Sequence, residues 1–249
     1  MSSVTERAAA SPTPVRRRRR VASVLQGLAI AVGFAMLVGG FGLIALDYRP
    51  YRVPTTSMSP TVEPGDTLLA RKVGGGSVGR GDVVVFSEQA WGGATMVKRV
   101  VGVGGDTVAS DPAGRISVNG TVIDETYSDA GKGVGAAFSV TVPEGRLFLL
   151  GDSRLNSLDS RSHLDVASGT VAATDVVAKV EAIAWPSSRA SLLARTAAFD
   201  SLKGPAATRP GLLAPAGYAA VGGAALVLIA ALMGWVATLV QRLARRRRA

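Results

Sequence analysis

Two long stretches without any charged residue constrain this 249-residue chain more than any other feature. They cover residues 21–46 and 211–240. An α-helix rises ~1.5 Å per residue, so the shorter stretch alone would form a helix of about 39 Å. That length is sufficient to cross a hydrocarbon core of ~30 Å. The sequence therefore predicts two transmembrane helices on either side of a separate domain at residues 47–205.

The net charge of +10 is concentrated at the two ends of the chain. Residues 1–20 contain six arginines and one glutamate, and residues 241–249 contain five arginines and no acidic residue. Basic and acidic side chains balance over residues 21–240, so the charge does not indicate nucleic-acid binding. Lys/Arg-rich flanks of membrane helices stay in the cytosol. We expect two basic cytosolic tails and an extracytoplasmic domain, all at the plasma membrane.

Each apolar stretch has an alternative interpretation. A cleaved signal peptide also places an apolar region behind basic residues, but that region is about 7–15 residues long. Residues 21–46 are longer, and Ala45-Leu46-Asp47 offers no small-x-small cleavage site. The stretch 211–240 contains Pro215 and many Gly and Ala residues, so a buried helical hairpin is its alternative interpretation. The arginines at 245–248 favour a second membrane span.

The segment between the two stretches is predicted to be mainly β. Its β-branched and aromatic residues occur in short runs separated by Gly, Pro, Asp or Asn. Asn119-Gly120 is typical of a two-residue hairpin turn. Residues 188–208 are expected to form a helical or loose connector. The predicted strands are 67–73, 82–86, 95–101, 115–118, 138–142, 146–150 and 176–185.

The chain has no cysteine and a single histidine, His163. The absence of cysteine excludes disulfides and thiolate nucleophiles. A Ser-His-Asp triad or a His-rich metal site would depend on that one histidine. A hydrolase built on this chain would therefore use a lysine or a carboxylate to activate a serine. We expect no metal and no organic cofactor.

Ser57 lies in a stiff Ser/Thr/Pro-rich segment soon after the first apolar stretch. Even a fully extended chain from Leu46 to Ser57 reaches only about 36 Å, so Ser57 is expected close to the outer membrane surface. Tyr48 and Tyr51 are typical of residues at the lipid headgroup level. The prolines on either side of Ser57 favour a loop that presents a hydroxyl group. Taken alone, this segment could also be an ordinary linker.

Lys98 is the candidate base. Alternate residues of a strand share a face, so Lys98 is expected beside Met96 and Val100. Apolar neighbours remove water from the ammonium group and lower its pKa from about 10.4. A neutral lysine amine can then accept a proton from a serine. A solvated strand lysine is the alternative.

A dense polar loop at residues 151–161 follows the apolar run 147–150. Polar groups ordered at the end of a strand can supply hydrogen bonds that position a catalytic amine. The loop could also be merely solvated, or it could be an Asp-rich cation site. A calcium loop is not favoured because the order of Asp, Asn, Gly and terminal Glu is absent.

Together these segments resemble bacterial type I signal peptidases, the membrane-anchored Ser/Lys proteases of family S26 that remove signal peptides from exported proteins. The resemblance covers roughly residues 30–187, and four boxes occur in the family order. It implies a β-rich catalytic domain outside the membrane, flanked by two transmembrane α-helices. The boxes are Pro54–Thr61 followed by Gly65-Asp66, then Arg80–Phe86, then Val97–Gly102 followed by Gly105-Asp106, and finally Gly151–Arg161.

The resemblance implies a role for each residue of a serine peptidase centre. Ser57 would be the nucleophile and Lys98 the general base, with Ser157 orienting the Lys98 amine. The backbone N–H of Ser57 and the hydroxyl of Thr55 would form the oxyanion hole. Thr55 stands where the family usually has Ser.

Two further groups of residues follow from the same resemblance. The first braces the polar loop, with Arg99 as the partner of Asp152, and consists of Asp152, Asp159, Arg161 and Arg99. The second lines shallow pockets for small substrate residues at positions −1 and −3 and consists of Val53, Met58 and Val97. The implied partners are secreted and membrane preproteins and the lipid bilayer, without nucleic acid.

A non-enzymatic function also fits the predicted architecture. A membrane-tethered β domain that is catalytically silent could bind extended peptides without cutting them. The presence of both Ser57 and Lys98 favours the enzyme over this alternative.

Overall fold

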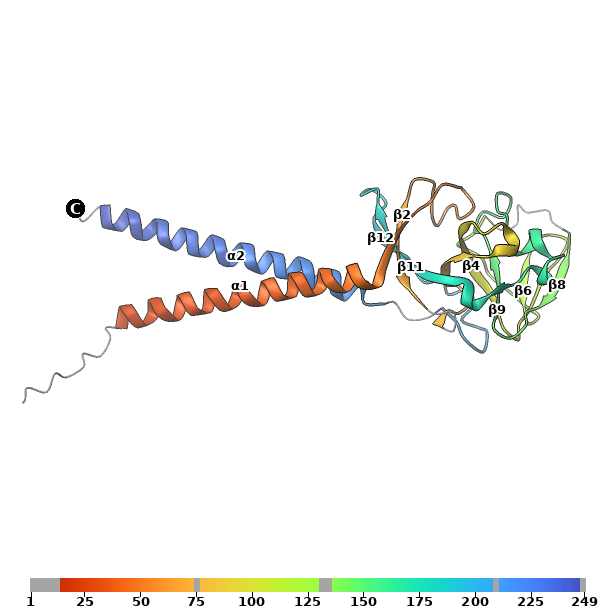
Figure 1. Ribbon diagram of the computed structural model, residues 1–249, viewed down its shortest axis with the longest axis horizontal. Coiled ribbons are helices and arrows are strands. Elements are labelled where there is room, and N and C mark those ends of the chain that lie inside the picture. Colours follow the sequence, from red (N-terminus) through yellow and green to blue (C-terminus); the bar gives the residue numbers. More distant parts are fainter. Residues whose placement is uncertain (1–13, 74–76, 130–135, 208–210, 247–249) are drawn as a thin grey trace, which may run out of the picture. The chain divides into compact units, whose positions relative to one another are not determined.

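The computed structural model describes residues 14–73, 77–129, 136–207 and 211–246 (Figure 1). The chain forms two compact units: one comprises residues up to Ile44 and from Ala214 onward, and the other comprises Ala45–Leu213. The two predicted basic tails lie partly outside the described residues.

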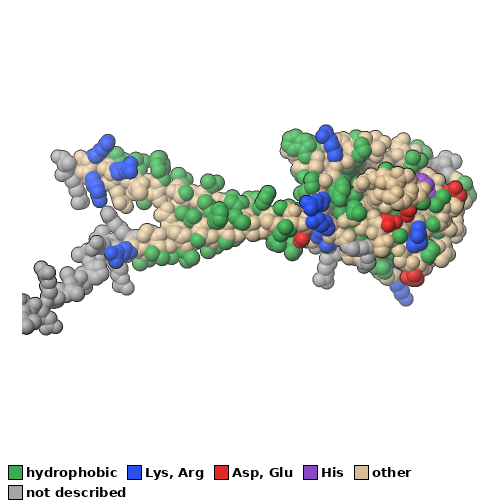
Figure 2. All heavy atoms as spheres, in the orientation of Figure 1, with side chains coloured by type: hydrophobic (Ala, Val, Ile, Leu, Met, Phe, Trp, Pro, Cys, Tyr) green, Lys and Arg blue, Asp and Glu red, His purple; other side chains and the backbone are tan. Residues whose placement is uncertain are grey.

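The helical unit consists of two long helices, α1 (Pro14–Asp47) and α2 (Leu213–Arg246). The spans Arg20–Asp47 and Leu213–Arg246 are long and apolar enough to cross a membrane, each with a mean hydropathy of 2.3. Figure 2 shows hydrophobic side chains along the surface of both helices, as in helices that face lipid. The two helices expected on either side of a β-rich segment are therefore present.

The two helices touch through small residues. Gln26, Gly33 and Gly40 recur every seven residues and so lie on one face of α1. A Cβ at Gly33 would lie 2.8 Å from the carbonyl oxygen of Gly223, and the Gln26 side-chain amide donates to the Ala230 carbonyl at 3.0 Å. Glycines allow the backbones to approach, which matters in lipid because apolar burial gives helices no net attraction there.

The described residues of the β unit form two sheets. The larger has the strand order β1-β2-β11-β3-β4-β9-β10, with β12 paired to β11, and the smaller has the order β7-β6-β5-β8. The strands of the large sheet are β1 (Tyr48–Arg52), β2 (Thr67–Lys72), β3 (Val83–Ser87), β4 (Thr95–Val103), β9 (Arg146–Leu150), β10 (Val171–Ala172), β11 (Val176–Trp185) and β12 (Ser191–Leu192). Those of the small sheet are β5 (Thr107–Ser110), β6 (Ile116–Val118), β7 (Thr121–Val122) and β8 (Phe138–Thr141).

All seven predicted strands are present to within about two residues. The Asn119-Gly120 turn joins β6 and β7, with positive φ angles of 53° and 80° at its two residues. Strand β1 was not predicted, because its sequence contains Pro50 and two arginines. It lies at the edge of the large sheet, where a missing N–H is tolerated.

At the start of the β unit, Tyr48 is buried and donates its hydroxyl to Glu181 at 2.6 Å, and its place at the headgroup level stays a prediction. At the other end of the β unit, one expectation is wrong. The connector after β11 is neither helical nor loose over its described residues, up to 207. Phe199 is almost fully buried in an apolar cluster with Phe148, because the segment packs on the β unit as a loop.

The glycine contacts predict that α2 is held against α1. Gly33→Leu should separate the helices, because its side chain would overlap the Gly223 backbone. A thiol cross-linker between cysteines introduced at Met36 and Gly222 would measure this, since the chain has no native cysteine. The matched change Gly27→Leu, where a Cβ meets nothing within 4 Å, should leave cross-linking unchanged. Equal yields in both variants would contradict the packing.

Candidate active site

Ser57 is carried on a loop between β1 and β2 that is closed at its base. The Val53 N–H donates to the Asp66 carbonyl at 2.9 Å, and the Gly65 N–H donates to the Val53 carbonyl at 2.8 Å. The Arg189 guanidinium pairs with the Asp66 carboxylate at 3.0 Å. These contacts fix the loop ends, so Ser57 is held in place although it belongs to no strand or helix.

The amine of Lys98 meets the hydroxyl of Ser57. Lys98 lies in β4 opposite Val84 of β3, and its Nζ is 2.8 Å from the Ser57 Oγ. The same Nζ lies 3.2 Å from the Val97 carbonyl oxygen. Lys98 is only 3% exposed and Ser57 8%. A buried lysine in contact with a serine hydroxyl is the arrangement that can turn the serine into a nucleophile.

Burial lowers the pKa of Lys98 below its usual value of 10.5, because an ammonium group loses hydration away from water. The carboxylates of Asp159 and Asp152 act in the opposite direction, and Arg161 adds to the lowering. The net shift favours the neutral amine. Only that form has a lone pair that can accept a proton.

Asp152 is neutralised by Arg99. The guanidinium of Arg99 donates two hydrogen bonds to this carboxylate, at 2.8 and 2.6 Å, and both side chains are buried. The hydroxyl of Thr61 donates to the same carboxylate at 2.6 Å. The Arg99 guanidinium also lies 4.1 Å from the centre of the Tyr127 ring, a cation–π contact. The structure thus contains the Arg99–Asp152 pair that the resemblance implies.

Asp159 is neutralised by Arg161. Their side chains form an ion pair at 2.9 Å, and Asp159 also accepts a hydrogen bond from the Gly151 N–H at 3.0 Å. These bonds hold the pKa of the Asp159 carboxyl below its usual range, although burial opposes that shift. Arg161 in turn donates to the Arg154 carbonyl at 2.8 Å. The two acidic residues near Lys98 are therefore both structural members of the loop.

Ser157 differs from its expected role. The structure lacks the hydrogen bond between Ser157 and the Lys98 amine that the resemblance implies, and the buried Ser157 Oγ has no hydrogen-bond partner of standard geometry. It packs instead against Gly151, where any side chain would overlap both the Ser157 Oγ and the Ser57 carbonyl oxygen. It also helps to lower the pKa of Asp159. Ser157 thus lies beside Gly151 and the polar loop, without a hydrogen bond to Lys98.

The remaining predicted residues lie around Ser57. The Thr55 hydroxyl is 3.3 Å from the Ser57 Oγ. It therefore lies near the place where a carbonyl group attacked by Ser57 would become an oxyanion. Val53, Met58 and Val97 belong to one apolar cluster. Val53 and Met58 are almost fully buried, and Val97 is partly exposed.

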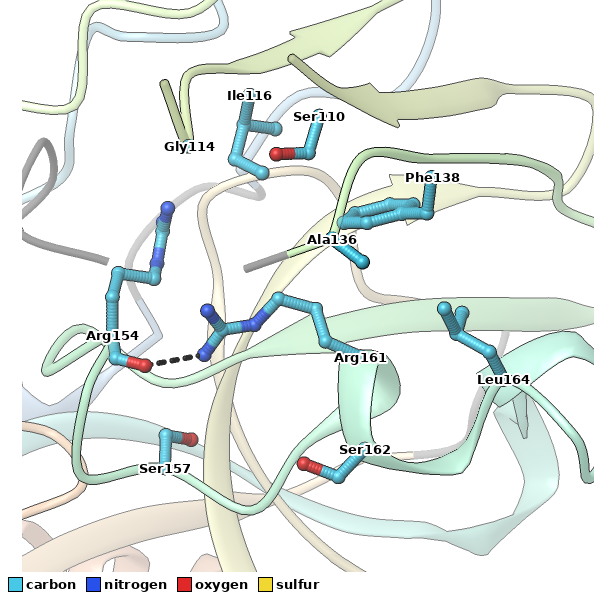
Figure 3. A pocket seen from close by; sticks show the side chains of 10 residues that line it. All are labelled: Ser110, Gly114, Ile116, Ala136, Phe138, Arg154, Ser157, Arg161, Ser162 and Leu164. Carbon is cyan, nitrogen blue, oxygen red and sulfur yellow. Dashed lines mark hydrogen bonds between the residues drawn. The ribbon is translucent and has the colours of Figure 1, made fainter. Parts of the chain in front are cut away.

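A cavity of about 220 Å³ adjoins the polar loop (Figure 3). Arg161 lies between Phe138 of the small sheet and Ser157 and Ser162 of the loop region. Ser157, one of the residues that line the cavity, lies next to Gly151. Within the described ranges, no three acidic or histidine side chains gather as metal ligands.

Several supporting residues gave no recognisable signal in the sequence. Glu125 forms a buried ion pair with Arg154, and Asp129 accepts hydrogen bonds from the Ser153 hydroxyl and the Arg154 N–H. Both acids come from the segment before the small sheet's last strand, far from the loop in sequence. His163 is structural: its ring stacks on Trp91 with centroids 4.2 Å apart.

Comparison with known proteins assigns the chain to a family. A family model described as signal peptidase, peptidase S26, matches residues 22–185. The chain belongs to that family and is a protease. It is 31% identical over 232 residues to the signal peptidase I of Mycobacterium tuberculosis (strain CDC 1551 / Oshkosh), covering 72% of this chain and 76% of that protein.

Other relatives carry the same name. The signal peptidase I of Bacillus amyloliquefaciens is 33% identical over 172 residues, covering 65% of this chain and 83% of the relative. A crystal structure of a signal peptidase I from Enterococcus faecalis V583 is 28% identical, with a TM-score of 0.33, and the match covers 40% of this chain and 93% of that one. The family model and the 31% identical mycobacterial relative show that the chain is an enzyme of the signal peptidase I class.

The lowered pKa of Lys98 predicts the pH dependence of the reaction. Activity should rise with pH as Lys98 loses its proton, with a midpoint below 10.5. Arg161→Gln should move this limb to higher pH, because it removes a cation that lowers the Lys98 pKa and leaves the Asp159 carboxylate without its ion-pair partner. A pH profile of kcat/KM would measure both.

Arg195→Gln provides the control, since Arg195 forms a comparable but exposed pair with Asp200. Its profile should match that of the unaltered protein. An Arg161→Gln profile that also coincides with the unaltered one would remove Lys98 as the titrating group.

Proposed function

We propose that this protein is a membrane-bound serine endopeptidase that removes N-terminal signal peptides from exported preproteins, with Ser57 as nucleophile and neutral Lys98 as general base. The observation that supports it most is the 2.8 Å contact between the buried Lys98 amine and the Ser57 hydroxyl. Membership of the signal peptidase family supports the substrate class.

The reaction follows from this contact. Lys98 takes the proton of the Ser57 hydroxyl as the Oγ attacks the carbonyl carbon of the scissile bond. The resulting oxyanion receives hydrogen bonds from the Ser57 N–H and the Thr55 hydroxyl. The Lys98 ammonium then protonates the leaving amine of the substrate and becomes neutral again. The neutral Lys98 amine next activates the water that hydrolyses the acyl-enzyme.

We assign the substrate site to the edge of β4 before Lys98. Strand β9 pairs with β4 only from Arg99 onward, whereas β3 pairs with β4 from Thr95. Among the described strands, none pairs with the other side of β4 at 95–98. An extended peptide can add as a strand to such an edge. In this proposal, the apolar cluster of Val53, Met58 and Val97 is the candidate lining of the pockets for small residues at the −1 and −3 positions.

We further propose that the β unit lies on the extracytoplasmic side of the plasma membrane with both chain ends in the cytosol. The basic residues outside the two apolar stretches support this orientation. A signal peptide is itself an apolar segment in the same membrane. Shared anchoring raises the effective concentration of enzyme and substrate.

The dyad assignment predicts that Ser57→Ala and Lys98→Ala each abolish turnover, with a loss of about 10⁴-fold or more, because neither residue works without the other. The assay follows cleavage of a preprotein with a small-x-small site by the purified full-length protein. The exposed residues Ser139 and Lys203 supply matched controls, and their alanine variants should remain active.

A thermal melt of each variant separates loss of chemistry from loss of folding. Near-normal turnover by a folded Lys98→Ala protein would disprove the dyad. An unaltered protein that binds the peptide without cutting it would favour the alternative, a silent peptide-binding β domain.

The oxyanion assignment predicts a separate effect at Thr55. Thr55→Val keeps the shape but removes the hydroxyl, and kcat should fall by about 10²- to 10³-fold with little change in KM. Thr55→Ser keeps the hydroxyl and should stay within a few-fold of the unaltered protein. Equal rates for the Val and Ser variants would leave the Ser57 N–H as the sole donor.

A further inference from the structure

Glu181 of β11 is a buried carboxylate that takes no part in the chemistry described above. It is 7% exposed and accepts three hydrogen bonds. Its donors are the Tyr48 hydroxyl at 2.6 Å, the Arg71 Nε at 2.7 Å and the Gly211 N–H at 3.0 Å. We name these four residues the exit cluster.

The donors of the exit cluster mark the two points where the chain leaves the β unit. Tyr48 is the first residue of β1 and directly follows the end of α1 at Asp47. Gly211 lies two residues before α2 begins at Leu213. Arg71, in β2, is the register partner of Tyr48. One carboxylate on the sheet therefore holds both exits of the chain.

The exit cluster is tightly packed. A Cβ at Gly211 would lie 2.6 Å from each of three polar atoms, the Arg71 Nε, the Glu181 Oε1 and the Tyr48 hydroxyl oxygen. Burial and the neighbouring Glu181 raise the pKa of the Tyr48 hydroxyl well above its usual value, so it remains a donor. A further bond ties the end of α1 to the sheet, from the Lys72 Nζ to the Leu46 carbonyl at 2.8 Å.

Holding two segments together with a buried carboxylate costs free energy, because the charge loses its hydration. Apolar residues of similar volume often give equal or greater stability than a buried ion pair. A charge with three directed donors instead specifies one geometry, because each donor must meet an oxygen. The exit cluster is therefore suited to fixing position rather than to adding stability.

Position matters for this enzyme because its substrate is held by the same bilayer. A strand advances about 3.3 Å per residue, so a rise or tilt of the β unit by that distance would present a different peptide bond to Ser57. Ser57 follows Tyr48 by nine residues along β1 and its loop. Freeing either exit would let the β unit move relative to the substrate.

We propose that Glu181 is a positioning residue: by holding both chain exits at one point, it sets the height of Ser57 above the bilayer and thereby selects which bond of a membrane-inserted preprotein is cut. This inference rests on the proposed function for its cleavage readout. A second readout, the height itself, does not depend on activity.

The test uses the full chain in vesicles of phosphatidylethanolamine and phosphatidylglycerol. The substrate is a preprotein with two successive Ala-x-Ala sites at different distances from its apolar segment. The unaltered protein should prefer one site by about tenfold or more, which corresponds to about 1.4 kcal/mol. Glu181→Leu should reduce this preference to about threefold or less. Mass spectrometry of the released fragments gives the ratio.

Two controls separate positioning from folding. Cleavage of a soluble peptide in detergent should stay within about threefold in Glu181→Leu, since the variant leaves the dyad untouched. Glu181→Gln should keep the site preference. Its amide oxygen can accept from Arg71 and Gly211, and its amide N–H can donate to the Tyr48 oxygen.

Gly211→Ala tests the same point without altering the carboxylate. Its methyl group should push the exit cluster apart, whereas Gly217→Ala, where a Cβ meets nothing within 4 Å, should not. Gly211→Ala should lose the site preference and Gly217→Ala should retain it. This pair decides the question if Glu181→Leu does not fold.

The height is measured by energy transfer from a dye at Val122→Cys, an exposed position, to labelled lipids. Glu181→Leu should shift or broaden the distance.

An unchanged site ratio and distance in both Glu181→Leu and Gly211→Ala would overturn the inference, as would equal losses on peptide and preprotein with the ratio unchanged. An unaltered protein that cuts neither substrate would refute the proposed function, and the distance would still test the exit cluster.

Discussion

The structure of the β unit depends on the contact between the buried Lys98 amine and the Ser57 hydroxyl. Burial against β3, β4 and the loop carrying Ser57 lowers the pKa of Lys98 and so favours the neutral amine, the form that the proposed general base needs. Desolvation is the largest cause of the lowered Lys98 pKa, with a smaller contribution from Arg161, whereas the carboxylates of Asp159 and Asp152 act against it. Packing that keeps water from one nitrogen is therefore a chemical requirement as well as a structural one.

The polar loop at 151–161 resolves a conflict that this requirement creates. Acidic groups order the loop beside the dyad, yet unpaired carboxylates there would restore the charge on Lys98. Each is matched by an arginine, in the pairs Arg99–Asp152, Asp159–Arg161 and Glu125–Arg154. Such buried pairs add little net stability, but breaking one leaves a buried charge without a partner. The three ion pairs hold the loop in place and reduce the electrostatic effect of its carboxylates on the Lys98 amine.

Attachment to a membrane adds a second positional constraint, which the β unit meets with the same kind of interaction. The carboxylate of Glu181 ties both chain exits to the sheet, as Asp152 and Asp159 tie the loop. Within the helical unit, glycines bring α1 and α2 into contact where lipid offers no hydrophobic attraction between helices. Directed hydrogen bonds and close backbone contacts thus fix the positions of these segments, which apolar burial does not do alone.

Local sequence pattern was sufficient to predict the features that depend on neighbouring residues. The two uncharged runs gave α1 and α2, β-branched runs gave seven strands, and the position of Lys98 in an apolar strand indicated a perturbed amine. Tertiary structure alone decided what depends on contacts between distant segments. Glu125, Glu181 and Gly211 acquire their partners only when strands far apart in the chain pair, and β1 forms only because β2 offers an edge. The buried Ser157 hydroxyl has no hydrogen bond to Lys98 for the same reason: the position of a loop side chain is set by what packs against it.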